Sequence, residues 1–153
     1  MDYPQNITLY EPVDKTAASL DSDSVNMGLL HRAICSLRFG VITGNSILTM
    51  YAGATAGAKT TALAFRYRLS SGDHKAASAD LFGALTTVAA TGLTLTAATF
   101  DHRIIQIDVE SADLTAGQPW LTFSVDATAN PMLISGNAQG EGRFKASIPV
   151  TAI

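Results

Sequence analysis

One stretch of the sequence has the residue types of a phosphate-binding loop. In YAGATAGAKTTALAFRYRL, residues 51–69, Gly53, Gly57 and Lys59 could cradle a nucleotide phosphate. The spacing differs from the G-x-x-x-x-G-K-[ST] pattern, because only three residues separate the glycines and Lys59 lies one place too far along. The residues that follow alternate between apolar and polar, which predicts a strand where a phosphate loop needs a helix. We therefore expect a hairpin loop and no nucleotide site.

The residues that could bind a metal are separated in the sequence. His31, His74 and His102 are isolated from one another, and the single cysteine, Cys35, excludes a Cys-x-x-Cys pair and an intramolecular disulfide. Cys35 falls in the apolar phase of its predicted strand, which is typical of a small buried hydrophobic residue. The acidic run DSDS at 21–24 lacks the glycine and the distal glutamate of a calcium loop. We expect no metal and no cofactor.

Motifs for nucleophilic or acid–base catalysis are missing as well. The chain has no G-x-S-x-G pattern. Asp108 and Glu110 share one face of a predicted strand, as paired carboxylates can, but they are out of phase with the apolar residues and should face solvent or a partner. We expect that the protein is not an enzyme. A hydrolase whose catalytic residues come from distant positions stays open as an alternative.

The arginines suggest a different kind of site. Arg66 and Arg68 share one face of a predicted strand, and Arg32 and Arg38 are likewise out of phase with the apolar residues of theirs. These four arginines form either an ordinary charged outer face or a docking surface, since arginine is enriched in protein interfaces. Trp120 is also out of phase with its strand, so it is either an interface anchor or a residue packed under a covered edge.

Composition limits the class of protein. The 153 residues are 47% hydrophobic and only 15% charged, with a net charge of −3. The low charged share indicates that a partner covers part of the surface, and the negative charge gives no reason to expect nucleic-acid binding. The start has no pattern of a signal peptide. The uncharged segment 81–100 has the length of a membrane span but consists mainly of Ala, Thr and Gly. Its pattern favours two short strands.

Period-two patterns supply the elements that would position these residues. They predict about eight strands, no substantial helix, and turns at the spacing typical of sandwiches and barrels. We expect an all-β fold, an antiparallel two-sheet β-sandwich of jelly-roll type spanning residues 25–153. Residues 1–24 are acidic and contain two prolines, and they predict an extended N-terminal arm. The predicted strands are 25–41, 46–53, 63–69, 81–88, 92–97, 103–110, 120–127 and 143–153, with an alternative short strand at 7–10 within the arm. The strand 46–53 is expected to pair back on 25–41 as a hairpin, and residues 130–142 are expected to be loop with a brief strand.

Several sequence segments resemble those of a known class of proteins. SDSVNMGLLHRAICSLRFGVITGNSILTMYAG, TTALAFRYRLSSGD, GLTLTAATFDHRIIQIDVESADL and WLTFSVDA look like segments of small virion structural proteins of tailed bacteriophages. With the further segment ADLFGALTT, the resemblance spans roughly residues 20–153. The resemblance is closest to head decoration proteins, also called cement proteins. It transfers no contact residue to this chain.

The resemblance implies a function that needs no active site. A decoration protein binds the outer surface of the head, contacts the major capsid protein and stabilises the capsid lattice. The implied localisation is the virion, after synthesis in the host cytoplasm. A homo-oligomer, with a trimer favoured, would multiply the binding energy of each copy. The alternatives are a neck, tail or fibre protein of the virion and a carbohydrate-binding β-sandwich.

Overall fold

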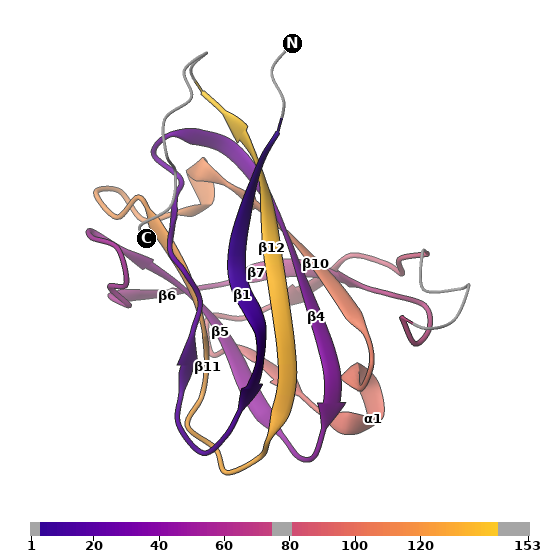
Figure 1. Ribbon diagram of the computed structural model, residues 1–153. Helices are drawn as coiled ribbons and strands as arrows, with labels where there is room; N and C mark the ends of the chain where they lie inside the picture. Colours follow the sequence, from indigo (N-terminus) through magenta and orange to yellow (C-terminus); the bar gives the residue numbers. More distant parts are fainter. Residues whose placement is uncertain (1–3, 75–80, 144–153) are drawn as a thin grey trace.

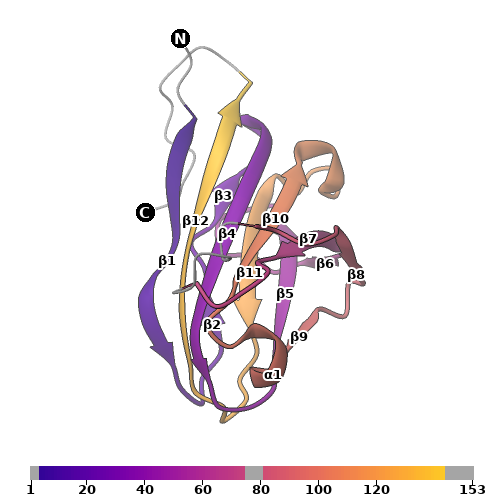
Figure 2. The same cartoon turned by 90° about the vertical axis from the view of Figure 1, so that its right-hand side faces the viewer.

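The strands of the protein form two antiparallel sheets that pack face to face. The computed structural model describes residues 4–74 and 81–143, and within these ranges each sheet has six strands (Figure 1). A view turned by 90° shows β1 and β12 on one side of the molecule and β5, β6 and β9 on the other (Figure 2). The prediction of an all-β, two-sheet sandwich is therefore confirmed.

The first sheet contains the long strands of the fold. Its order is β1-β12-β4-β10-β7-β8, and all its pairings are antiparallel. The strands are β1 (Gln5–Lys15), β12 (Met132–Gly142), β4 (Leu30–Ile42), β10 (Ile104–Glu110), β7 (Phe65–Leu69) and β8 (Thr86–Val88).

The second sheet is built on two central strands. Its order is β2-β11-β5-β6, with β3 added against β11 and β9 against β5. The strands are β2 (Leu20–Asp21), β3 (Val25–Asn26), β11 (Trp120–Val125), β5 (Ser46–Gly53), β6 (Thr61–Leu63) and β9 (Leu93–Leu95). Helical structure in the described residues is limited to α1 (Ala97–Phe100) and the 3₁₀ turn η2 (Ser111–Asp113).

The strand order is that of a jelly roll. Working inward from the ends, β1 pairs with β12, β2 and β3 pair with β11, β4 pairs with β10, and β5 pairs with β9. Successive pairs lie in alternate sheets, as when one long hairpin is wrapped around a barrel. The segment between β5 and β9 adds β7 and β8 to the edge of the first sheet beyond β10.

Alternating side chains from both sheets fill the core. On β4 the inward residues Ala33, Cys35 and Leu37 are completely buried, and on β11 Leu121 and Phe123 are at most 1% exposed. Burial of such apolar area at about 25 cal/mol per Å² is the main stabilising term of the fold. Residues between these positions face outward and set the chemistry of the two outer surfaces.

The N-terminal residues are extended, but they belong to the two sheets, and the short strand predicted at 7–10 is part of the longer β1. Residues 5–15 form β1, which pairs with β12 over its whole length, and β2 pairs with β11. Ile7, Leu9 and Tyr10 are buried, and Lys15 is only 2% exposed because its Nζ donates to both oxygens of Thr128. The prolines and acidic residues suggested an arm, but Pro12 lies on an edge strand, which tolerates proline, and the acidic side chains Glu11 and Asp14 are exposed.

Two other expectations about strands need correction. The predicted strand 25–41 is interrupted between β3 and β4, and β4 does not form a hairpin with β5, because consecutive strands of a jelly roll enter opposite sheets. The segment 81–100 does form two short strands, but β8 and β9 lie in different sheets. Most of the predicted strand 143–153 lies outside the described residues.

Residues 130–142, expected to be loop with a brief strand, contain the eleven-residue strand β12. Gly136 and Gly140 face inward, where an added Cβ would lie 2.4 Å from Leu37 Cδ2 and 2.7 Å from Leu30 Cδ1, respectively. These glycines therefore make room for leucines of the neighbouring β4. The signal was present as small residues alternating with polar ones, from Ile134 to Glu141.

Candidate docking face

The predicted arginines lie on the outer surface of the first sheet. Arg32 and Arg38 come from β4, and Arg66 and Arg68 come from β7, two strands away across β10. Each arginine has at least one sequence neighbour in the core, and these neighbours are Ala33, Leu37, Phe39, Phe65 and Tyr67. Because neighbouring residues of a strand point to opposite faces, all four guanidinium groups lie on the same outer surface. We call this surface the arginine face.

Strand register arranges the arginine face in rows. Across the sheet, Gln106 is opposite both Arg68 and Ser36, and Asn137 is opposite Ser36. This row is polar from end to end. A parallel row places Arg32 between Glu110 and Glu141. The face therefore has an acidic end around Arg32, and a second part where arginine meets uncharged polar residues.

Three of the predicted arginines surround one depression. Arg32, Arg66 and Arg68 line a hollow of about 190 Å³ together with four further residues. These are Ile34, Leu85, Gln106 and Asp108. Leu85 is 44% exposed, although an apolar side chain of that size is usually more buried. Arginine is enriched at protein interfaces, and here three arginines surround one exposed apolar side chain.

Arg32 is paired within the chain. Its Nε donates to Asp108 Oδ1 at 2.6 Å, and its Nη2 donates to Asp108 Oδ2. The hydrogen bond and the charge of Asp108 raise the pKa of the Arg32 guanidinium, and Glu141 and Glu110 act in the same direction. Asp108 and Glu110 thus face outward, as predicted. Arg32 is already neutralised and is poorly suited to recruit a partner.

The other arginines keep their charge available. Neither Arg38 nor Arg66 enters an ion pair among the described residues. Arg68 donates one Nη1 hydrogen bond, 3.2 Å long, to the carbonyl of Gly83, and that oxygen is uncharged. Arg66 and Arg68 are two residues apart on one strand, about 7 Å from the strand rise, a separation that suits two carboxylates on a facing surface.

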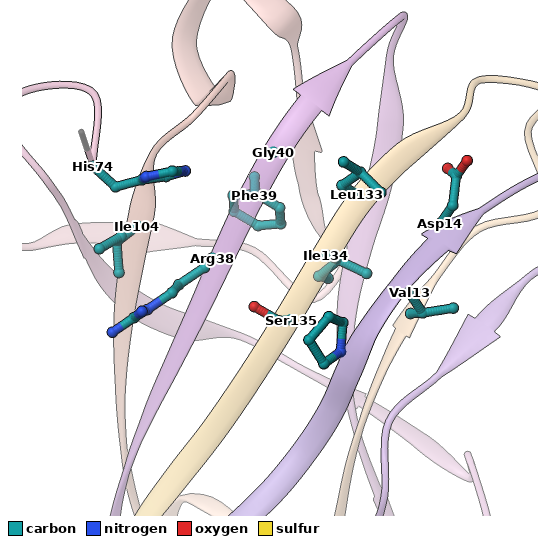
Figure 3. Close-up of a pocket in the computed structure, with 11 residues that line it drawn as sticks. Val13, Asp14, Arg38, Phe39, Gly40, His74, Ile104, Leu133, Ile134 and Ser135 are labelled. Carbon is teal, nitrogen blue, oxygen red and sulfur yellow. The ribbon is translucent and has the colours of Figure 1, made fainter.

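Arg38 lines a second and larger hollow on the same face. A groove of about 490 Å³ crosses β10, β4, β12 and β1, with Arg38, Ile104 and His74 at one end and Val13 and Asp14 at the other (Figure 3). Leu133 on β12 also lines it and is 48% exposed. The groove therefore repeats the chemistry of the depression, with arginine beside an exposed leucine.

Trp120 does not belong to the arginine face. It begins β11 in the second sheet, opposite Gly53 of β5 and Asn26 of β3, and it is half-buried. Thr122, the next outward residue of β11, is fully buried because Ser24 covers it through a 2.8 Å hydrogen bond between the two hydroxyls. Trp120 therefore lies on the second sheet, next to a position that Ser24 covers.

The glycine-rich stretch is the loop between β5 and β6. A strand follows it, as predicted, and Lys59 is held by Asp21 at 2.9 Å. Gly57 has a φ of +76°, which glycine adopts without strain, and its N–H donates to Ser24 Oγ. At Gly53 an added Cβ would lie 2.2 Å from the carbonyl oxygen of Ala58. The glycines therefore let the loop fold back onto the second sheet.

The expectation that the histidines are isolated is wrong for two of them. The rings of His74 and His102 meet edge to face with 5.7 Å between centroids, and Asp73 adds a carboxylate to the same cluster. Sequence distance concealed this contact, because the loop after β7 and the turn after α1 are brought together by the pairing of β7 with β10. His31 is exposed on β4, away from this cluster.

Sequence reasoning missed the uncharged residues that complete the face. Gln106, Ser36 and Asn137 join the arginines only through the register of three strands that are distant in sequence. The sequence pattern predicts that these side chains point outward. It does not predict which strands are neighbours in the sheet.

Comparisons of the chain with models of protein families, with curated proteins and with solved structures find no match. In the described part of the chain, no helix has the length and apolar character needed to cross a bilayer.

Proposed function

We propose that this protein is a docking protein of a virus particle, a capsid decoration protein of the kind carried by tailed bacteriophages. In this proposal the arginine face contacts the major capsid protein and the second sheet faces away from it. The observation that carries the docking role is the presence on one sheet surface of Arg38, Arg66 and Arg68, which have no carboxylate partner in the described chain, beside the exposed Leu85 and Leu133.

Two observations support a capsid as the partner. Sequence segments between residues 20 and 153 resemble virion proteins. The jelly-roll strand order is an architecture that recurs in viral capsid and lectin domains. The chain also carries a low share of charged residues, which fits a protein whose surface is partly covered.

The binding mechanism is burial of one rigid face. A standard interface buries about 1,600 Å² in total, and guanidinium groups contribute most where they form paired hydrogen bonds to carboxylates. The proposed partner surface is therefore an acidic patch on neighbouring capsid subunits. A trimer of this chain would bind more tightly than one copy, because each contact raises the effective concentration of the others.

Co-sedimentation with heads of the virus that encodes the chain tests this proposal. The chain should bind at hundreds of copies per head, and Arg66→Gln/Arg68→Gln should weaken binding at least tenfold. Arg32→Gln is the matched control, because this arginine lies in the same depression but is already paired with Asp108, so its loss should weaken binding much less.

Each other outcome contradicts a stated part of the proposal. A few copies located at the neck or tail would assign the chain to that part of the virion. Binding to glycans in the absence of heads would support a carbohydrate-binding sandwich. Equal effects of the Arg66/Arg68 and Arg32 variants would show that the arginine face is an ordinary solvated surface.

A further inference from the structure

We propose that Asp73, His74 and His102 form a binding site for a divalent transition metal of the zinc class. One ligand atom from each of these residues lies within 4.8 Å of the other two. Imidazole nitrogen and carboxylate oxygen are the donors that Zn²⁺, Co²⁺ and Ni²⁺ accept, whereas Ca²⁺ and Mg²⁺ prefer oxygen alone. This site is independent of the proposed docking role.

Backbone hydrogen bonds hold the two ligand-bearing segments together. The N–H of His74 donates to the carbonyl of His102 at 2.8 Å, and the N–H of His102 donates to the carbonyl of Gly40 on β4 at 3.0 Å. Ser70 and Ile104 complete the connection, since the N–H of each donates to an oxygen of the other, at 2.9 and 3.1 Å. The ligands are thus placed by the fold before any metal arrives.

His102 has two features that a metal would explain. It is the one non-glycine residue with positive φ, 54°, within the described ranges, and such backbone strain concentrates at functional sites. Its Nδ1 atom is also buried without a hydrogen-bond partner in the described chain. Burial of an unsatisfied polar atom costs about 1–3 kcal/mol. Coordination of a metal by this nitrogen would offset that cost.

The distances and charges fit a tetrahedral ion after a small adjustment. Bonds of about 2.0–2.1 Å place tetrahedral ligand atoms roughly 3.4 Å apart, so side-chain rotations must shorten the present separations by at most about 1.4 Å. Asp101 adds a second carboxylate, 4.0 Å from His102 Nε2, which offsets the charge of a divalent ion and can orient the ring. Arg103 turns its guanidinium away, toward the carbonyl of Ser70.

Three protein ligands leave one position for water. The ion would connect the loop after β7 to the turn after α1, which are already adjacent, and so would stabilise the folded state by mass action. His74 also lines the groove that contains Arg38, so the metal would lie at the border of the arginine face.

Titration of the full chain with Zn²⁺ by calorimetry, and with Co²⁺ by visible absorption, tests the proposal. We expect one equivalent to bind, d–d absorption typical of tetrahedral Co²⁺, and a higher midpoint of thermal unfolding with Zn²⁺. His74→Gln should weaken binding at least tenfold. His102→Asn should do the same while keeping the fold, because asparagine tolerates positive φ.

His31→Gln is the matched control, since it removes the third histidine of the chain from a position outside the cluster. It should leave affinity unchanged. Absence of binding by the wild-type chain at millimolar metal would overturn the proposal. So would binding that persists in His74→Gln and His102→Asn, or that is lost equally in His31→Gln.

Discussion

Arg32 of β4 and Asp108 of β10 lie diagonally across the strand pair and join through two hydrogen bonds, from Nε to Oδ1 and from Nη2 to Oδ2. This pairing separates Arg32 from the other three arginines of the face, although all four have the same phase in the sequence. It divides the surface into a part satisfied within the chain and a part whose positive charge is available.

The pairing of Arg32 with Asp108 should appear as a coupling free energy between the two side chains. Their side chains are 43% and 35% exposed, so solvent screens the charges. Surface ion pairs stabilise a fold by about 0–1 kcal/mol, and the bidentate geometry here favours the upper end of that range. A double-mutant cycle of Arg32→Met and Asp108→Asn should give about 0.5–1 kcal/mol in urea unfolding. Arg66→Met, the control, should change stability by less than about 0.5 kcal/mol. Zero coupling would contradict the assignment of Arg32 as paired.

The glycine loop makes a steric prediction. In Gly53→Ala the new Cβ would meet the backbone carbonyl of Ala58, and a backbone atom cannot move aside as a side-chain end can. We expect a loss of about 1–3 kcal/mol, the usual cost of overpacking. Gly83→Ala is the control, because the atom nearest to its added Cβ is the Leu69 carbonyl oxygen at 3.6 Å, an ordinary contact. Similar stabilities of the two variants would refute a close approach at Gly53.

The first strand should contribute to stability like any other core strand. Leu9 is 3% exposed within β1, so Leu9→Ala should reduce the free energy of unfolding by about 2–5 kcal/mol. Thr8→Ala on the exposed side of the same strand should change it by less than about 0.5 kcal/mol. If both substitutions were neutral, residues 5–15 would behave as the arm that the sequence suggested.

The single thiol should be unreactive in the folded protein. Cys35 is completely buried, and burial raises the pKa of its thiol to about 12, with a smaller contribution from the charge of Asp108. The reactive thiolate is therefore nearly absent at pH 8. A chromogenic disulfide reagent should label the native chain only at the rate of unfolding and label the chain at once in guanidinium. Rapid native labelling would show that β4 is open to solvent.

Acid should weaken the contact between Asp21 and Lys59. Burial acts to raise the pKa of Asp21, but hydrogen bonds from Lys59 and Ser124 and the charge of Lys59 together lower it below its ordinary value of 3.8. A lowered folded-state pKa stabilises the fold above the unfolded pKa, and this stabilisation is lost as the pH falls through the folded value. The stability difference between wild type and Asp21→Asn should thus be largest near pH 6 and shrink toward pH 3. A constant difference would mean that the contact is not ionic.

The alternation of residues was enough to predict the sandwich and the outward direction of the arginines. Phe65, Tyr67, Ala33 and the residues flanking Arg38 carry that information locally. Which strands are neighbours depends on long-range pairing, so the row from Arg68 to Asn137 and the contact of His74 with His102 could not be predicted. The length of β12 was not predicted, because the role of its inward glycines is set by leucines on another strand.

The proposed function, a capsid decoration protein, is tested most directly by cryo-electron microscopy of virus heads assembled from the genome that carries this sequence. The proposal predicts density for the chain over the whole head, with the first sheet toward the capsid and Arg66 and Arg68 within hydrogen-bonding distance of capsid carboxylates. A chain bound through its second sheet, with the arginine face toward solvent, would contradict it, and so would heads that carry no copy.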